Sequence, residues 1–140
     1  MTGNDNTKEK LIRQPMPYGK VLIVDDVDIN IEITKVLLLP YKLNVDEALS
    51  GFEAIAKLEH GENYDLIFMD HLMPKMDGLE TTIKIREMGY TVPIIALTAN
   101  PVAGQEELFR ENGFDGYMLK PVDIRQLDEI LNKFIRDIHI

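Results

Sequence analysis

The sequence predicts an α/β protein in which helices cover both faces of one parallel sheet. Five short apolar segments alternate with five segments that carry apolar residues at helical spacing, between residues 20 and 138. Strict alternation is typical of parallel strands joined by crossover helices, and right-handed crossovers leave few topologies. Polar residues follow the strands, and in an open parallel sheet the carboxyl ends of the strands face one ligand-binding crevice.

Four of the predicted strands end in residues that can carry chemistry. The apolar run Val21–Val24 precedes Asp25 and Asp26, and the run 65–70 closes in Asp70. The strands near 94–97 and 117–119 are followed by a hydroxyl and an ammonium group, those of Thr98 and Lys120. We therefore expect three carboxylates, a hydroxyl and a lysine to meet at one edge of the sheet. The remaining strand, at 43–47, is short and alternating.

Capping residues mark the starts of three predicted helices. Ser50 with Glu53, and Asp77 with Glu80, match the capping box, in which each side chain bonds an otherwise unpaired backbone N–H. Asp123 is the predicted N-cap of the last helix. These signals fix where the helices begin after the second, third and fifth strands.

The predicted helices differ in the strength of their apolar faces. The first helix ends at Pro40, and its face is expected from Ile29, Ile33, Val36 and Leu37. The fourth is predicted to start at Asn100 and Pro101 and to end near Gly113, with a thin face made mainly of Val102, Leu108 and Phe109. The last has the clearest face, made of Ile124, Leu127, Ile130, Leu131, Phe134, Ile135 and Ile138. Few anchors make the fourth helix the easiest to move.

Composition indicates one globular domain. The chain has 140 residues, 45% of them hydrophobic, and a formal net charge of −9 that disfavours direct contact with nucleic acid. It has no cysteine, which excludes disulfides and thiol chemistry. We see neither a signal peptide nor an apolar run of the roughly 20 residues that span a bilayer. We therefore expect a cytoplasmic protein without direct membrane contact.

The first 19 residues are polar, include Pro15 and Pro17, and lack a periodic pattern. We expect residues 1–19 to form a flexible tail or the remnant of an interdomain linker. The folded domain is then predicted to cover residues 20–138.

Three carboxylates in one crevice repel one another, so they need a cation or a retained proton. Lys120 can neutralise part of the charge. Mg²⁺ is the natural ion to neutralise the rest, because it prefers oxygen ligands. No pair of histidines has the spacing of zinc ligands. Mg²⁺ and a lysine stabilise the oxygens of a phosphoryl group in transfer, and an Asp carboxylate can form an acyl phosphate.

Each of these residues also has a simpler interpretation. An Asp after a strand is commonly a turn or capping residue, Thr98 could simply end a strand, and a lysine before proline is commonly a solvated one. The coincidence of four such residues at four strand ends favours the functional interpretation. His71 could act as a base beside Asp70, but we favour a loop residue, and His60 and His139 are expected at the surface.

Together these segments resemble the receiver domains of two-component response regulators. The resemblance covers about residues 20–138 and is carried by VLIVDD (21–26), DLIFMDHLMPKMDG (65–78), PIIALTAN (93–100) and GYMLKP (116–121). It implies a flavodoxin-like (βα)5 three-layer sandwich with strand order 2-1-3-4-5. The pattern is most similar to receivers of hybrid sensor histidine kinases and phosphorelays.

The resemblance also implies roles for individual residues. Asp70 matches the phosphoacceptor, Asp26 the direct Mg²⁺ ligand and Asp25 the acid that holds the ion through water, with the main-chain carbonyl of Leu72 as a further ligand. Lys120 would contact the phosphoryl group, and its peptide bond to Pro121 would be cis. Thr98 and Tyr117 match the switch pair.

The implied function is a phosphoacceptor switch that takes a phosphoryl group from a phosphohistidine. The implied partner is a histidine kinase or a histidine-containing phosphotransfer protein, and a homodimer on phosphorylation is possible. The isolated chain is not expected to be an enzyme, although a hybrid parent would be a histidine kinase. Leu72 and Asn100 stand where receivers tune hydrolysis, and Leu72 predicts slow loss of the phosphoryl group.

Two alternatives remain open. One is a receiver-like interaction module that is never phosphorylated. The other is a phosphatase of the haloacid dehalogenase type. The spacing of Asp26 and Asp28 superficially matches the paired acids of that type.

Overall fold

The computed structural model describes residues 11–99 and 103–139 and contains one five-stranded parallel sheet. The strand order is β2-β1-β3-β4-β5, which confirms the predicted flavodoxin-like topology. The strands are β1 (Lys20–Val24), β2 (Asn44–Ala48), β3 (Leu66–Asp70), β4 (Ile94–Thr98) and β5 (Gly116–Leu119). Every residue of β3 and β4 is buried, as expected for strands covered on both faces.

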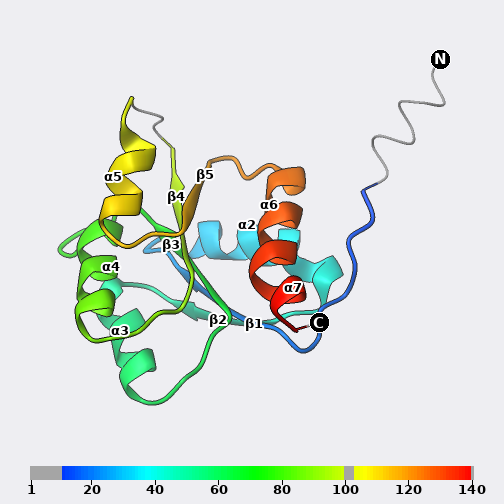
Figure 1. Ribbon diagram of the computed structural model, residues 1–140, viewed down its shortest axis with the longest axis horizontal. Coiled ribbons are helices and arrows are strands. Elements are labelled where there is room, and N and C mark those ends of the chain that lie inside the picture. Colours follow the sequence, from blue (N-terminus) through cyan, green and yellow to red (C-terminus); the bar gives the residue numbers. More distant parts are fainter. Residues whose placement is uncertain (1–10, 100–102, 140) are drawn as a thin grey trace.

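Helices form the two outer layers (Figure 1). One layer contains α2 (Asp28–Leu38), α6 (Ile124–Leu131) and α7 (Asp137–His139), and the other contains α3 (Gly51–Glu59), α4 (Gly78–Glu87) and α5 (Gln105–Glu111). A 3₁₀ turn, η1 (Leu39–Tyr41), follows α2, and a π-helical turn, η2 (Asn132–Arg136), joins α6 to α7. Each layer packs its own apolar cluster against the sheet. Among the described residues, no helix combines the length and apolar character needed to cross a membrane.

The helix caps form as the sequence predicts. Ser50 accepts a hydrogen bond from the backbone N–H of Glu53 at 3.0 Å, and Asp123 caps α6 through the N–H of Arg125. Asp77 accepts from the N–H of Glu80 at 2.8 Å, while the Glu80 carboxylate accepts from the N–H of Asp77 at 3.2 Å. The predicted cap at Asn100 and Pro101 lies outside the described residues, and α5 begins after Gly104.

The predicted face of the first helix is wrong except for Leu37, which is half-buried against the core cluster. Ile29 and Val36 are each 62% exposed, whereas α2 buries Ile31, Thr34 and Leu38. Apolar residues occur around most of this helix, so two sets with helical spacing were available and periodicity could not choose between them. The set that is buried is Ile31, Thr34 and Leu38, and the tertiary packing of the helix determines this choice. An apolar surface therefore remains exposed on α2.

Several of residues 11–19, the described part of the segment predicted to be a flexible tail or linker remnant, contact the domain. Met16 is fully buried in the cluster beneath α2 and α6, and its backbone N–H donates to the carbonyl of Tyr41 at 2.6 Å. The guanidinium of Arg13 lies 5.1 Å from the ring centroid of Tyr41. Tyr41 in turn donates to Asp128 of α6 at 2.7 Å. Tyr41 thus links this segment to α6.

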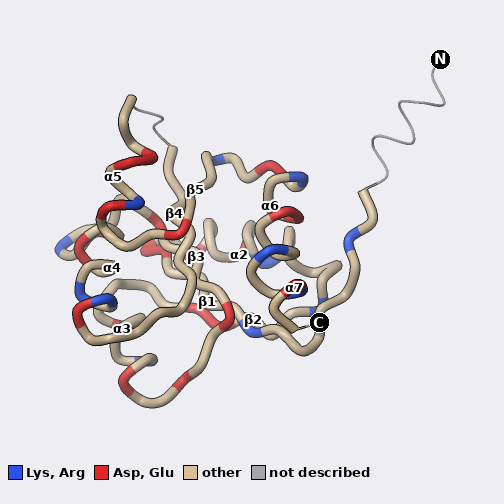
Figure 2. The backbone as a smooth tube through the Cα atoms, viewed as in Figure 1, with Lys and Arg blue, Asp and Glu red and all other residues tan. Residues whose placement is uncertain are grey.

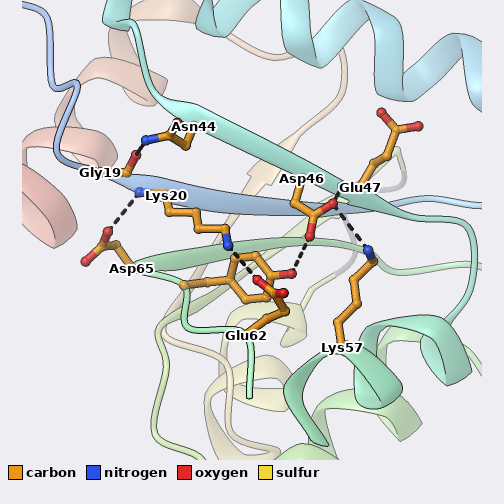
Figure 3. Close-up of polar contacts among 9 residues, drawn as sticks. Gly19, Lys20, Asn44, Asp46, Glu47, Lys57, Glu62 and Asp65 are labelled. Atoms are coloured by element: carbon orange, nitrogen blue, oxygen red, sulfur yellow. Dashed lines mark hydrogen bonds and ion pairs between the residues drawn. The ribbon is translucent and has the colours of Figure 1, made fainter. Parts of the chain in front are cut away.

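Charged side chains line the edge strand β2 (Figure 3). Asp46 accepts hydrogen bonds from the hydroxyl of Tyr64 at 2.5 Å and from Lys57 at 3.3 Å. Partial burial opposes the charge of Asp46, but these bonds hold its pKa below its usual value. Nearby, Lys20 pairs with Glu62 at 2.6 Å. Charges on an edge strand discourage pairing with another chain. Acidic and basic residues also occur on the helices of both layers (Figure 2).

The carboxyl end of α5 is held by Arg86 of α4. Its guanidinium donates to the carbonyls of Gly113 and Tyr90 at 2.9 and 3.0 Å and to the carboxylate of Asp115 at 3.0 Å. Gly113 has a φ of 100°, and a Cβ there would lie 2.7 Å from the Arg86 side chain. Glycine is therefore required at this turn for both conformation and space.

Candidate functional site

The predicted acidic residues meet at the carboxyl ends of β1 and β3. Asp25, Asp26 and Asp70 each offer a carboxylate oxygen, and these atoms lie within 4.8 Å of one another. Asp25 and Asp70 are buried and Asp26 is exposed. Asp25 also accepts a hydrogen bond from the N–H of Val27 at 3.0 Å, which shapes the turn into α2. The turn function considered for Asp25 thus coexists with its place in the cluster.

Lys120 bridges two of these acids from the end of β5. Its ammonium group lies 3.0 Å from Asp70 and 3.4 Å from Asp25. The backbone places it there, since the N–H of Lys120 donates to the carbonyl of Thr98 at 2.8 Å. The Lys120–Pro121 peptide is cis, as the resemblance implies. The lysine therefore supplies a positive charge on the side of the cluster that faces β4 and β5.

Burial and charge shift the pKa values of the two central groups. Burial raises the pKa of Asp70, and the nearby charges of Asp25 and Asp26 act in the same direction, while Lys120 opposes them. Burial disfavours the charge of Lys120, but its hydrogen bond to Asp70 and the charges of Asp70 and Asp25 hold its pKa above the usual value. The site therefore has an excess of negative charge that a cation would relieve.

The loop after β3 folds tightly against Asp70. A Cβ on Gly78 would lie 2.2 Å from the carbonyl oxygen of Asp70, and the N–H of Gly78 donates to the carbonyl of His71 at 2.9 Å. The capping box at Asp77 then starts α4. Leu72 lies at the surface of this loop and is 59% exposed. The carboxylate of Asp70 lines an open cavity beside this loop.

That cavity has a volume of about 280 Å³ and is lined by residues from four strand ends, including Asp26, Asp70, Leu72, Thr98 and Lys120. It contains carboxylate oxygens and a primary amine but neither thiolate nor a pair of histidines. Oxygen donors of this kind suit Mg²⁺, which takes one or two carboxylates and keeps several waters. The donor set therefore fits the ion predicted from the sequence.

Thr98 is the buried last residue of β4. Its hydroxyl oxygen accepts a hydrogen bond from the side-chain amide of Gln105 at 3.3 Å. Gln105 is the first residue of α5 and is only 8% exposed. The sequence interpretation missed Gln105, although its position four residues before Phe109 places both on one helical face.

Tyr117, the other predicted switch residue, is half-buried in β5 and packs on the buried ring of Phe109. The ring centroids of the two lie 5.9 Å apart. Phe109 also meets the ring of His71 edge-on at 5.0 Å. His71 therefore lies in the loop after β3, as favoured, and faces an aromatic ring.

Comparison with known proteins agrees with this geometry. Residues 21–132 match the model of the response regulator receiver domain family. The chain is 40% identical over 123 residues to hybrid signal transduction histidine kinase L of Dictyostelium discoideum, which covers 83% of this chain but 7% of that protein. It is 38% identical over 129 residues to two-component response regulator 24 of Arabidopsis thaliana, covering 92% and 93% of the two chains.

Among solved structures, the receiver domain of sensor histidine kinase PA1611 from Pseudomonas aeruginosa is similar, with a TM-score of 0.74 and 34% identity. The match covers 84% of this chain and 98% of that domain, which holds a magnesium ion in its active-site cleft. The fold and the site thus define the class of protein, a phosphate-signalling module with acids and a lysine at the strand ends. The chain belongs to the response regulator receiver domain family.

Membership of this family removes the phosphatase alternative. Asp28, the second acid of that interpretation, is exposed in the first turn of α2. His60 and His139 are exposed, as expected; His139 also contacts Asp65, at the other end of β3 from Asp70, at 3.0 Å.

Proposed function

We propose that this domain is a signalling switch in which Asp70 accepts a phosphoryl group. The observation that supports it most directly is the cluster of Asp25, Asp26 and Asp70 within 4.8 Å, bridged by Lys120. Asp70 is a buried member of this cluster at the end of the central strand β3, and it lines the cavity. The family assignment makes phosphoryl transfer the reaction that such a cluster serves.

In the proposed reaction, a carboxylate oxygen of Asp70 attacks the phosphorus of a donor phosphohistidine. A P–O bond forms, the P–N bond breaks, and the donor imidazole takes up a proton. Lys120 keeps Asp70 ionised and can then bond a phosphoryl oxygen. Thr98, on the next strand, can donate its hydroxyl to another. Asp70 itself carries the transferred group, so the domain acts as a phosphoryl acceptor rather than as a turnover enzyme.

We propose that Mg²⁺ binds at this cluster. Asp26 would be a direct ligand, with Asp70 and the main-chain carbonyl of Leu72, and Asp25 would act through water. When bound, the ion would supply positive charge to the phosphoryl oxygens and offset the repulsion among the acids. The excess negative charge at the site supports this assignment, as does the oxygen-only donor set.

The partner we propose is a histidine kinase or a histidine-containing phosphotransfer protein in the cytoplasm. The chain corresponds to 7% of hybrid kinase L but to most of response regulator 24, so both a module of a larger kinase and a small regulator are represented among its relatives. We keep residues 20–138 as the proposed receiver domain, with residues 11–19 packed against it. Dimerisation on phosphorylation stays a prediction, which sedimentation before and after phosphorylation would check.

Intact mass after incubation with acetyl phosphate tests the proposal. Wild type should gain one phosphoryl group with Mg²⁺ and none with EDTA, and Asp70→Asn should gain none. Asp65→Asn is the matched control, because Asp65 lies just before the same strand at the far end from the site, and it should be phosphorylated as wild type is. Failure of wild type with both acetyl phosphate and a phosphorylated donor protein, together with no Mg²⁺ binding, would leave the unphosphorylated interaction module as the function.

The lifetime of the acyl phosphate is a separate prediction. Leu72 has no group that could orient an attacking water, so hydrolysis should be slow. Leu72→Asn would offer such a group and should shorten the lifetime. Phosphate release measures the hydrolysis of the acyl phosphate. Equal rates for wild type and Leu72→Asn would contradict this role.

A further inference from the structure

Two buried side chains anchor the described part of α5, and each contacts one of the two switch residues. Gln105 and Phe109 are the buried residues of this seven-residue helix. Gln105 donates its amide to the hydroxyl oxygen of Thr98 at 3.3 Å, and the ring of Phe109 packs on Tyr117. Leu108, expected as an anchor, is 43% exposed. The inner face of α5 thus contacts both residues of the predicted switch pair.

We propose that Gln105 is a latch that holds Thr98 in the arrangement of the unphosphorylated domain; this inference rests on the proposed function of Asp70. Thr98 is β-branched, so its side chain occupies discrete rotamers rather than a continuous range. The amide of Gln105 stabilises the rotamer that keeps the hydroxyl oxygen within reach of α5. A phosphoryl group on Asp70 offers new acceptor oxygens to the same hydroxyl.

The strength of this contact suits a switch. At 3.3 Å it lies beyond the usual range of N–H···O hydrogen bonds, so it is weak and can be exchanged. A hydrogen bond from a hydroxyl to a charged phosphoryl oxygen is stronger. The exchange therefore favours movement of Thr98 once Asp70 is phosphorylated.

The burial of Gln105 explains why the exchange reaches α5. Gln105 is buried, so a change in the polar groups around its amide carries a desolvation cost unless the side chain adjusts. Such an adjustment shifts the first turn of α5, whose other buried anchor is the ring contact of Phe109. Gln105 thus acts through Thr98 and is a positioning residue for the switch.

Replacing Gln105 with methionine tests the latch, because methionine has a similar length and keeps the position apolar. In the ligand-free protein, three-bond couplings of the Thr98 methyl carbon should report a redistribution of its χ1 rotamers. The dissociation constant of beryllofluoride, a phosphoryl mimic, with Mg²⁺ should fall about fivefold, which corresponds to ~1 kcal/mol. Glu107→Gln, in the same helix but exposed, should change neither quantity.

Several outcomes would overturn the latch. Unchanged Thr98 couplings in Gln105→Met would show that the amide does not hold the side chain, and a weaker or equal beryllofluoride affinity would show that it does not favour the unphosphorylated arrangement. The same measurements on Gln105→Leu decide the question if the methionine variant does not fold. If wild type binds no beryllofluoride and accepts no phosphoryl group, the proposed function fails and the latch with it; a change in the Thr98 couplings alone would then show only that the contact exists.

Discussion

Replacing Asp70 with asparagine should stabilise the fold while preventing phosphorylation. Asp70 is buried, and its carboxylate lies within 4.8 Å of those of Asp25 and Asp26. Asparagine has nearly the same shape and keeps an oxygen that can accept a hydrogen bond from Lys120. The substitution therefore removes a charge with little change in packing.

The sign of the effect follows from three contributions. At an effective dielectric constant of about 20, the repulsion between Asp70 and the buried Asp25, whose carboxylate oxygens lie within 4.8 Å, is ~3.5 kcal/mol or more, with a smaller share from the solvent-screened Asp26. The attraction of Lys120 at 3.0 Å is ~5.5 kcal/mol on the same scale. These nearly cancel, so the cost of burying the charge, several kcal/mol per ion, decides the balance. Part of that cost remains with the amide, and we expect a net gain of ~2 kcal/mol.

The assay is urea unfolding in EDTA. For a domain of this size, a stabilisation of ~2 kcal/mol also raises Tm by ~6 °C. Millimolar Mg²⁺ should narrow the difference, because an ion that binds the wild-type acids stabilises the folded state. Since the pKa of folded Asp70 is raised, the advantage of the variant should also vanish below pH ~4, where Asp70 is protonated in both states. The reasoning would be refuted if Asp70→Asn were no more stable than wild type in EDTA at neutral pH. Asp65→Asn is the control and should not be stabilised.

Three further predictions concern the scaffold. Met16→Ala should lower the free energy of unfolding by ~2–4 kcal/mol in urea, whereas the exposed Ile12→Ala should change it little; equal effects would show that residues 11–19 do not pack as described. Gly78→Ala should impair phosphorylation and lower Tm, since its Cβ would press on the backbone of Asp70; normal phosphorylation kinetics would contradict this. Tyr41→Phe should lose ~1 kcal/mol at neutral pH, and because burial raises the pKa of Tyr41 to about 12, this deficit should shrink as pH rises from about 10 to 12; a deficit independent of pH would argue against it.

The strands and their terminal residues were predictable because their signals are local. A short apolar run followed by an acid, a threonine or a lysine fixes both a buried strand and the residue at its end, and parallel alternation brings those ends together. Asp25, Asp26, Asp70 and Lys120 were found in this way. The caps at Ser50 and Asp77 were equally local.

The parts that could not be predicted depend on tertiary contacts. The buried face of α2 required knowing which side of an apolar helix meets the sheet. Met16 lies in a segment without a periodic apolar pattern, and only its tertiary packing shows that it belongs to the core. Gln105 is polar, so no hydrophobic pattern could indicate that it faces Thr98.

The contacts of Arg86 give α5 two ends of different character. At the carboxyl end, hydrogen bonds from Arg86 to Gly113 and Asp115 do not involve the site, and we expect them to persist on phosphorylation. At the amino end, Gln105 contacts Thr98, which lies at the site. A helix fixed at one end and released at the other moves as a lever, so its displacement is greatest at Gln105 and smallest at Gly113. Hydrogen exchange should accordingly form a gradient along α5 on phosphorylation, with the amide of Gly113 nearly unchanged.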